Sequence, residues 1–164
     1  MRSMRSNYLI SLLLTATVVG CVAAPASAQR GPVRGVAAFG IEAAGGVLGS
    51  AAGLGLGFLI TNPGDCPSDD LGCTLQKVGA ALAISAGGSG LGTVVLGRAS
   101  HTQPSALGAF VGAAVGIAAG VGVVHLISEE LDLSREDAVL WVGYTLTQGV
   151  VSALGSRLVR ALRS

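Results

Sequence analysis

The stretch GAFVGAAVGIAAG, from Gly108 to Gly120, decides how this chain folds. Glycine recurs in it at every fourth position among wholly apolar residues, as Gly108, Gly112, Gly116 and Gly120. Residues spaced by four lie on one face of a helix, so this helix would have one face without side chains. Helices in a membrane gain from close packing rather than from escape from water, and small residues permit that approach. The stretch therefore predicts a membrane helix that packs through a glycine row.

A second row of the same kind occurs earlier, in GGVLGSAAGLGLG. Its members are Gly45, Gly49, Gly53 and Gly57. A single pair of glycines four residues apart arises often in a glycine-rich chain, but two rows of four are much stronger evidence. A flexible linker would mix glycine with serine and other polar residues, whereas Val, Leu, Ile and Phe separate these glycines. Both rows are therefore interpreted as helix-packing faces.

The composition favours a bilayer as the surroundings of the chain. Of 164 residues, 51% are hydrophobic, only 12% are charged, and 26 are glycine. A water-soluble domain of this size needs a polar shell, and the few charges here stand between apolar runs or near the chain ends. The net charge of +1 gives no electrostatic footprint for nucleic acid. We expect the lipid bilayer as the main partner and no nucleic acid.

The first 28 residues read as a bacterial export signal. Arg2 and Arg5 precede an apolar stretch, which ends before the small-residue site Ala26-Ser27-Ala28. Cleavage there would leave residues 29–164 as one membrane domain. Two alternatives remain open, namely a lipoprotein signal in which Cys21 is lipidated, and an uncleaved anchor. Each alternative exports the chain to the cell envelope.

Four apolar segments follow the signal. They predict an all-α membrane fold of four glycine-rich transmembrane helices, at about residues 35–60, 78–97, 105–127 and 137–160, packed as two antiparallel hairpins. Asn62-Pro63-Gly64 ends the first segment, and Ser134 with Asp137 reads as the N-cap of the fourth. The run Gly87-Gly88-Ser89-Gly90 is weak helix and is the expected place for a kink.

The fourth segment carries polar residues at three- and four-residue steps, which form one stripe on a helix: Thr145, Gln148, Ser152, Ser156, Arg160 and Arg163. We expect Thr145 and Gln148 to contact the bundle, and Arg157, Arg160 and Arg163 to reach the lipid headgroups. Trp141 and Tyr144 suit the membrane interface.

Two cysteines lie close together in the polar loop between the first two segments. In an exported protein, Cys66 and Cys73 are expected to form a disulfide that closes this turn. A metal site would need further Cys or His partners, and a redox pair would more typically be C-x-x-C. These remain the alternatives.

With its export signal and the two glycine rows, the chain resembles the bacterial glycine-zipper envelope proteins, which include the 17-kDa surface antigen type. The resemblance is one of pattern and covers about half of the chain. It implies a structural or surface role in the envelope without catalysis. That group typically has two apolar segments, whereas this chain has four.

Charge is segregated between the two sides of such a bundle. Four crossings place six arginines on one side, namely Arg30, Arg34, Arg98, Arg157, Arg160 and Arg163, and the acidic loops on the other. A cleaved signal would leave the basic N-terminus outside the cytoplasm, against the positive-inside rule, and would turn the disulfide loop toward a reducing compartment. Insertion in the outer membrane removes both conflicts and is favoured over the inner membrane.

Location in the outer membrane also raises an alternative fold, an eight-stranded outer-membrane β-barrel, although segment three lacks the alternation and aromatic girdles of barrel strands.

Motifs for catalysis are missing from the sequence, which contains no G-x-S-x-G, H-E-x-x-H or P-loop. His101 and His125 offer little for a ligand site. Glu42 is the exception, because a carboxylate inside a membrane segment suggests a functional role. An ion pair with Arg34, or contact with the headgroups, is the simpler interpretation.

We expect a non-enzymatic structural or interaction protein without a cofactor or small-molecule substrate, and self-association through glycine rows. A small channel or permeability factor is the alternative.

Overall fold

The chain folds into four long helices. A computed structural model describes residues 35–62, 66–67, 70–131 and 138–163. The helices are α2 (Val36–Thr61), α3 (Leu71–Ala99), α4 (Ala106–Leu131) and α5 (Ala138–Ala161). All described secondary structure is helical, so the barrel alternative is wrong for this part of the chain. The predicted signal at 1–28, Cys21, Arg30, Arg34 and the predicted cap at Ser134 and Asp137 lie outside the described residues.

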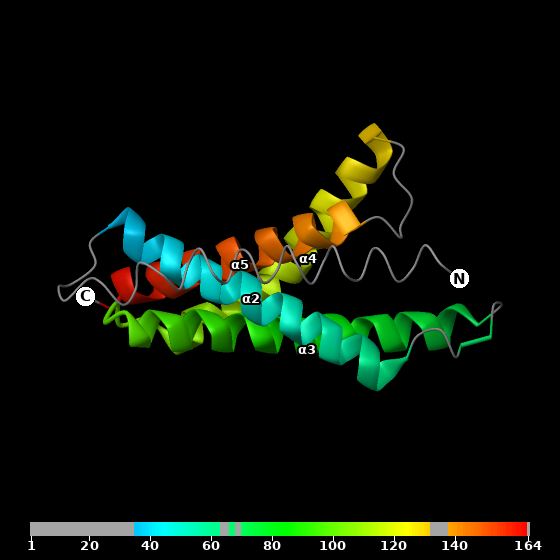
Figure 1. The fold of residues 1–164 in the computed structure, drawn as a ribbon, viewed down its shortest axis with the longest axis horizontal. Coiled ribbons are helices and arrows are strands. Elements are labelled where there is room, and N and C mark those ends of the chain that lie inside the picture. The colour runs from blue at the N-terminus through cyan, green and yellow to red at the C-terminus, as the bar shows by residue number, and fades with distance from the viewer. Residues whose placement is uncertain (1–34, 63–65, 68–69, 132–137, 164) are drawn as a thin grey trace.

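The helices pack as two antiparallel hairpins, which confirms the predicted pairing. α2 packs along α3, and α4 packs along α5. The hairpins meet mainly where α5 contacts α2 and where α4 contacts α3. Figure 1 shows α2 and α3 lying side by side, with the far end of α4 turned away from them. The four helices therefore form a close bundle at the end that holds the C-terminus and diverge toward the other end.

Helix α3 differs from its prediction in two ways. It begins at Leu71 rather than near residue 78, because the Asp70 side chain caps it and accepts a hydrogen bond from the Cys73 backbone N–H at 2.9 Å. It also continues without a break through Gly87-Gly88-Ser89-Gly90. Packing of this glycine run against neighbouring helices outweighs its weak helix propensity.

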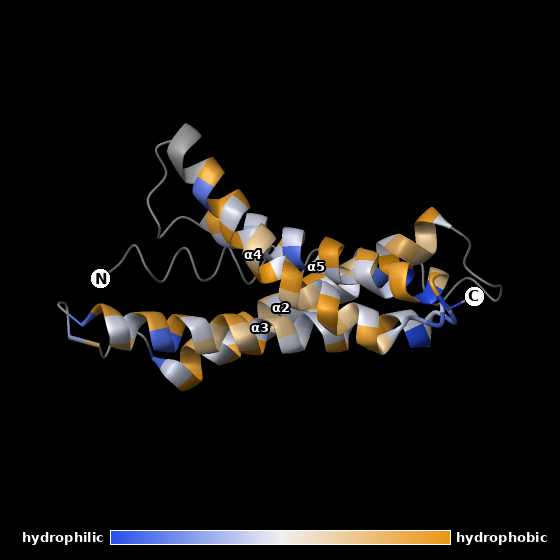
Figure 2. Ribbon diagram, turned by 180° about the vertical axis from the view of Figure 1, so that it is seen from behind, coloured by the Kyte–Doolittle hydropathy of each residue, from blue (hydrophilic) through white to orange (hydrophobic). Residues whose placement is uncertain are grey.

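The bundle carries its apolar side chains outward. Large exposed hydrophobic residues occur on all four helices, and Figure 2 shows the most hydrophilic residues gathered near the helix ends. Within the described part of the chain, three helices are long and apolar enough to cross a membrane: Val36–Thr61, Leu71–Ala99 and Ala106–Leu126. α5 is not among them.

The turn between α3 and α4, residues 100–105, is tightly constrained. His101 and Gln103 adopt left-handed backbone conformations, with φ of 58° and 50°. Such conformations are uncommon outside glycine and persist when the surroundings hold them in place. The Thr102 hydroxyl donates to Gly97 O at 3.0 Å, and the Ser105 N–H donates to Ser156 Oγ at 3.0 Å. The second bond ties the turn to α5.

Candidate functional site: a buried polar row between glycine-packed hairpins

The first glycine row lies against α3. A Cβ added at Gly49 would overlap Gly88 O, and one added at Gly88 would overlap Gly49 O; Gly45 and Gly92 form a second reciprocal pair of the same kind. At each position a glycine hydrogen points at a carbonyl oxygen instead, the geometry of a weak Cα–H···O bond. Added Cβ atoms at Gly53 and Gly57 would also meet α3 backbone, at 2.7 Å from Ile84 O and 2.7 Å from Ala81 Cα. Only residues without a Cβ allow α2 and α3 to lie this close.

The second row lies against α5 in the same manner. Gly108 and Gly155 form a reciprocal pair, in which a Cβ on either glycine would overlap the other's carbonyl oxygen. A Cβ at Gly112 would lie 2.5 Å from Val151 O, and one at Gly116 would lie 3.0 Å from Gln148 Cα. Gly120 faces the Tyr144 ring, and a Cβ added there would lie 2.6 Å from it. Each predicted row therefore packs against the helix with which it forms a hairpin.

Contact between the two hairpins also depends on glycine. A Cβ on Gly46 of α2 would lie 2.8 Å from both Gly149 Cα of α5 and Thr93 Oγ1 of α3. Gly90 of α3 receives the Phe110 ring of α4, 2.6 Å from the added Cβ position. Neither the contact of Gly46 with Gly149 nor that of Gly90 with Phe110 was predicted. Gly46 and Gly149 are single positions outside both glycine rows, so their spacing does not mark them.

The polar stripe of α5 faces the centre of the bundle from Thr145 to Ser156, whereas Arg160 and Arg163 at its end are exposed. Gln148 is 0% exposed, and its Oε1 accepts hydrogen bonds from the Ser50 hydroxyl of α2 and, at 2.8 Å, from the Ser85 hydroxyl of α3. Its Nε2 donates to Ala113 O of α4 at 3.4 Å. One amide side chain thus bonds to the other three helices.

One turn further along α5, Ser152 makes a similar link. Its hydroxyl donates to Ala109 O of α4 at 3.0 Å and lies 3.0 Å from the Thr93 hydroxyl of α3. Ser156 follows at the next turn with its bond to the α3–α4 turn. Together with Ser50, Ser85, Thr93 and Gln148, these two serines form the polar row of the bundle. The prediction that Gln148 contacts the bundle is confirmed.

Glu42 pairs with α5, not with the headgroups. Its side chain is 0% exposed, and Oε2 accepts a bond from Arg157 Nε at 3.1 Å. Arg157 is 26% exposed, and its guanidinium carbon lies 5.4 Å from the centre of the Phe39 ring. Glu42 Oε1 and Arg157 Nη2 are buried and without a hydrogen-bond partner, so the pair makes one nitrogen–oxygen bond rather than two. The expected headgroup contact is therefore wrong for Glu42, and Arg34 lies outside the described residues.

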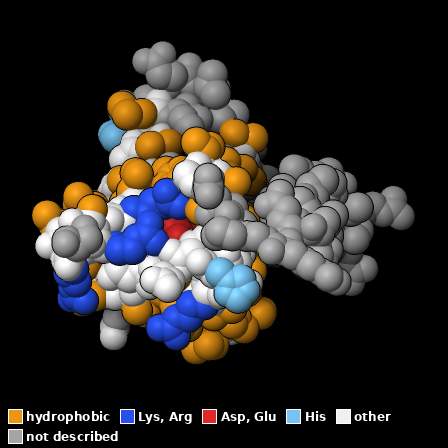
Figure 3. Space-filling view, turned by 90° about the vertical axis from the view of Figure 1, so that its left-hand side faces the viewer, with side chains coloured by type: hydrophobic (Ala, Val, Ile, Leu, Met, Phe, Trp, Pro, Cys, Tyr) orange, Lys and Arg blue, Asp and Glu red, His pale blue; other side chains and the backbone are white. Residues whose placement is uncertain are grey.

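The C-terminal arginines share one end of the bundle with Arg98. Arg160 Nη1 donates to Thr102 O and, at 3.4 Å, to Gln103 O, which are carbonyls of the left-handed turn. Figure 3 views the bundle end-on and shows basic side chains around a small acidic area. Two of the predicted headgroup ligands, Arg157 and Arg160, are thus engaged within the protein.

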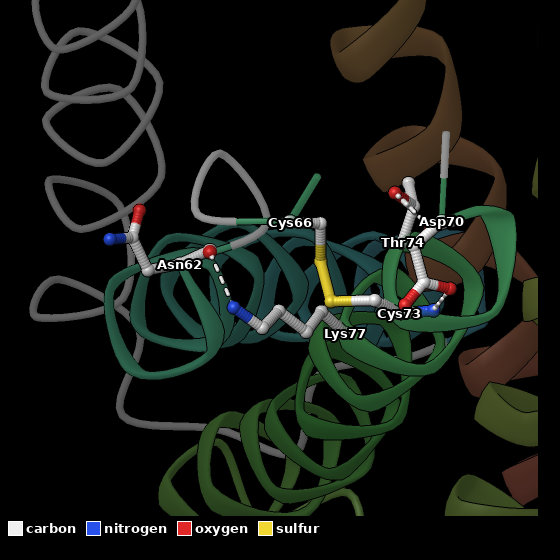
Figure 4. The surroundings of a disulfide bond; sticks show 6 residues. All are labelled: Asn62, Cys66, Asp70, Cys73, Thr74 and Lys77. Atoms are coloured by element: carbon white, nitrogen blue, oxygen red, sulfur yellow. Dashed lines mark hydrogen bonds between the residues drawn. A yellow bond between two sulfur atoms is a disulfide. The ribbon is translucent and has the colours of Figure 1, made fainter. Parts of the chain in front are cut away.

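The disulfide lies toward the other end. Cys66 and Cys73 are bonded, with their Cα atoms 5.8 Å apart. Figure 4 shows this bond beside the Asp70 cap, and Lys77 Nζ donates to Asn62 O at 3.1 Å. Both features join the end of α2 to the start of α3, so the disulfide stabilises the α2–α3 connection.

These features are those of a packing core. Within the described ranges, no three residues of the types His, Cys, Asp and Glu lie close enough to hold a metal ion. The polar row bonds within itself and to backbone carbonyls. Gln148 and Glu42 are fully covered, so no water-sized space adjoins either side chain. The arrangement is suited to holding four helices together, a class of four-helix bundle with apolar outer and polar inner surfaces.

No protein family model, curated protein or solved structure matches this chain. The resemblance to glycine-zipper envelope proteins therefore stays a prediction from the sequence pattern.

Proposed function

We propose that this chain is a non-enzymatic structural or interaction protein of a bacterial cell envelope, and that all four helices cross a membrane. The observation that carries the proposal is the inverted distribution of side chains, with polar groups inside and large apolar ones outside. Water would penalise the exposed apolar surface, whereas hydrocarbon favours it, and most of the buried polar groups find partners within the bundle.

Helix α5 belongs in the membrane despite its polar sequence. Its polar residues lower its hydropathy, yet Gln148, Ser152 and Ser156 are at most 1% exposed. The outward side chains are apolar and 38% to 63% exposed: Val139, Val142, Leu146, Val150, Leu154 and Leu158. Along most of α5 a lipid neighbour would meet this apolar surface, and the partly exposed Arg157 and exposed Arg160 lie near the end of the helix. A crossing α5 would also be about 36 Å long, enough for a hydrocarbon core of about 30 Å.

Labelling of single introduced cysteines tests the α5 crossing. Val139→Cys and Leu162→Cys flank α5, and Thr74→Cys and Ser100→Cys flank α3 as the matched control. An impermeant maleimide applied to sealed vesicles would label Leu162→Cys from the same side as Ser100→Cys, and Val139→Cys from the opposite side. Labelling of both α5 positions from one side would refute the crossing.

Self-association is the second part of the proposal. Both predicted glycine rows are occupied within the chain, so a second copy would need another small-residue face. Gly79, Ala83 and Gly87 supply one on α3; Gly79 and Ala83 are exposed, and added Cβ atoms at Gly79 and Gly87 would meet nothing within 4 Å. Chemical cross-linking in native membranes should give a dimer that Gly79→Leu with Gly87→Leu abolishes. The control is Gly55→Leu, at an open position on α2; no dimer in the parent chain would remove this part of the proposal.

The channel alternative is not adopted, because Glu42 and the stripe residues Gln148, Ser152 and Ser156, the polar groups available to line a path, are buried. Conductance above the lipid background, abolished by Gln148→Leu, would reverse that choice.

Location in the outer membrane stays part of the proposal. It rests on the predicted export signal, and on a disulfide whose formation needs an oxidising compartment. Fractionation of the two membranes would test it.

A further inference from the structure

The arginine end of the bundle is a concentrated positive surface. It comprises Arg98 at the end of α3 and Arg157, Arg160 and Arg163 at the end of α5. Arg98, Arg160 and Arg163 are exposed, whereas the one carboxylate among the described residues at this end, Glu42, is 0% exposed. Figure 3 shows basic side chains gathered around a small acidic area at this end.

Internal bonds orient two of these arginines and leave two free. Glu42 holds Arg157, and the carbonyls of the α3–α4 turn hold Arg160. Among the described residues, the side chains of Arg98 and Arg163 have no hydrogen-bond or ion-pair partner. A free guanidinium presents several N–H donors in a planar fork that matches phosphate.

Apolar side chains border this end directly. Leu158 and Leu162 stand beside the arginines of α5 and are 63% and 78% exposed, and Val95, one turn before Arg98, is 59% exposed. In a bilayer the lipid phosphates lie at the edge of the hydrocarbon, where arginine side chains reach them. The arginines thus stand at the depth of lipid phosphates.

The opposite end of the bundle is not a positively charged surface. The α2–α3 loop contains Asp65, Asp69 and Asp70, and the first two turns of α3 add one lysine, Lys77. Anionic lipid would be repelled there and attracted at the arginine end.

We propose that the arginine end binds the phosphate groups of anionic phospholipids, with Arg98 and Arg163 as direct ligands. The inference rests on the proposed membrane function. It names the class of lipid that the protein binds, and it places the two ends of the bundle in different leaflets of the membrane.

Native mass spectrometry of the detergent-purified chain tests the inference, with phosphatidylglycerol and phosphatidylcholine titrated in parallel. Phosphatidylglycerol should bind more tightly, and salt should remove the difference. Each basic residue near a membrane surface contributes about 1 kcal/mol, which is about fivefold in affinity. Arg98→Gln with Arg163→Gln should therefore weaken phosphatidylglycerol binding roughly 25-fold and weaken phosphatidylcholine binding less, because the choline cation offsets the charge of that lipid's phosphate. Lys77→Gln, which removes a positive charge at the opposite end, is the matched control and should have no effect.

Three results would overturn the inference. They are equal binding of both lipids, an unchanged affinity in the double arginine variant, and full displacement of the lipid by an equal concentration of inorganic phosphate. Because both arginines are exposed, the variant should keep its helical circular dichroism spectrum. A chain that inserts into phosphatidylcholine vesicles without preferring phosphatidylglycerol would refute this inference alone. A chain that inserts into neither lipid would refute the proposed function.

Discussion

A single methyl group at Gly49 should loosen the α2–α3 hairpin. In Gly49→Ala the new Cβ would overlap Gly88 O and lie 2.6 Å from Gly88 C and 3.2 Å from Ser89 N. All three are backbone atoms of a helix, so no side chain can rotate away. To restore an ordinary contact of 3.4 Å to Gly88 C, the helices must separate by at least roughly 0.8 Å, and the closer overlap with Gly88 O requires more. That movement would also break the reciprocal contact of Gly88 with Gly49 O.

The expected cost follows from measured overpacking. Extra methyl groups in tightly packed cores destabilise proteins by about 1–3 kcal/mol, and the upper part of that range applies because only backbone can move. Helix propensity opposes this cost, since alanine is better than glycine by about 1 kcal/mol in water. We expect a net loss of about 1–2 kcal/mol in the free energy of unfolding.

Gly55→Ala is the matched control, because it lies in the same helix and its added Cβ would meet nothing within 4 Å. It should be neutral or stabilising by up to about 1 kcal/mol. The assay is unfolding in mixed micelles of dodecylmaltoside and sodium dodecyl sulfate, followed by far-UV circular dichroism. Equal stability of the two variants would refute the close-packing argument.

Three further changes can be measured in the same assay. Gln148→Leu should lower the free energy of unfolding by about 1 kcal/mol, at the low end for a lost buried acceptor. The loss is small because the Ser50 and Ser85 hydroxyls still lie 3.0 Å apart and can bond to each other. An unchanged stability would mean that the Gln148 amide does not hold the helices together. Glu42→Gln should cost about 1–3 kcal/mol, less than a fully buried pair, because Arg157 can turn toward water. Adding Arg157→Gln should recover part of that loss, and a purely additive double variant would contradict the pairing. Cys66→Ser with Cys73→Ser should cost about 2 kcal/mol through the freed loop, whereas an unchanged stability under reducing conditions would contradict this.

Periodicity in the sequence was enough to predict the helices and their pairing into hairpins. The predicted bounds of α2 and α5 lie within one residue of the observed ones, because Pro63 and the charged loops give sharp limits. The start of α3 was missed because residues 71–77 continue a polar, acidic loop sequence and include Gln76 and Lys77, which hide the spacing of Leu71 and Leu75. Its cap is a single aspartate, Asp70, whose role depends on local geometry rather than on spacing.

Contacts between the hairpins could not be predicted. Glu42 and Arg157 are 115 residues apart, and no local pattern relates them. The spacing of small residues likewise did not show which of two faces of α3 packs against α2. Gly88 and Gly92 pack against α2, whereas Gly79 and Gly87 remain open, because the position of α2 decides which face is used. The orientation of Arg160 toward the α3–α4 turn depends on carbonyls exposed by the unusual backbone at His101 and Gln103.

The pairing of each glycine row with the next helix along the chain gives assembly a natural order. The contacts of Gly45 and Gly49 with α3 are local in sequence, and local contacts form quickly because little loop entropy is lost. The first hairpin needs no residue beyond Ala99, so it can form before it meets α4 and α5. The bonds of Gln148 and Arg157 must wait for the C-terminal helix, so docking of two preformed hairpins would be the last step of biogenesis. Variants of the glycine rows should therefore fail early, and variants of the polar row should accumulate as undocked hairpins.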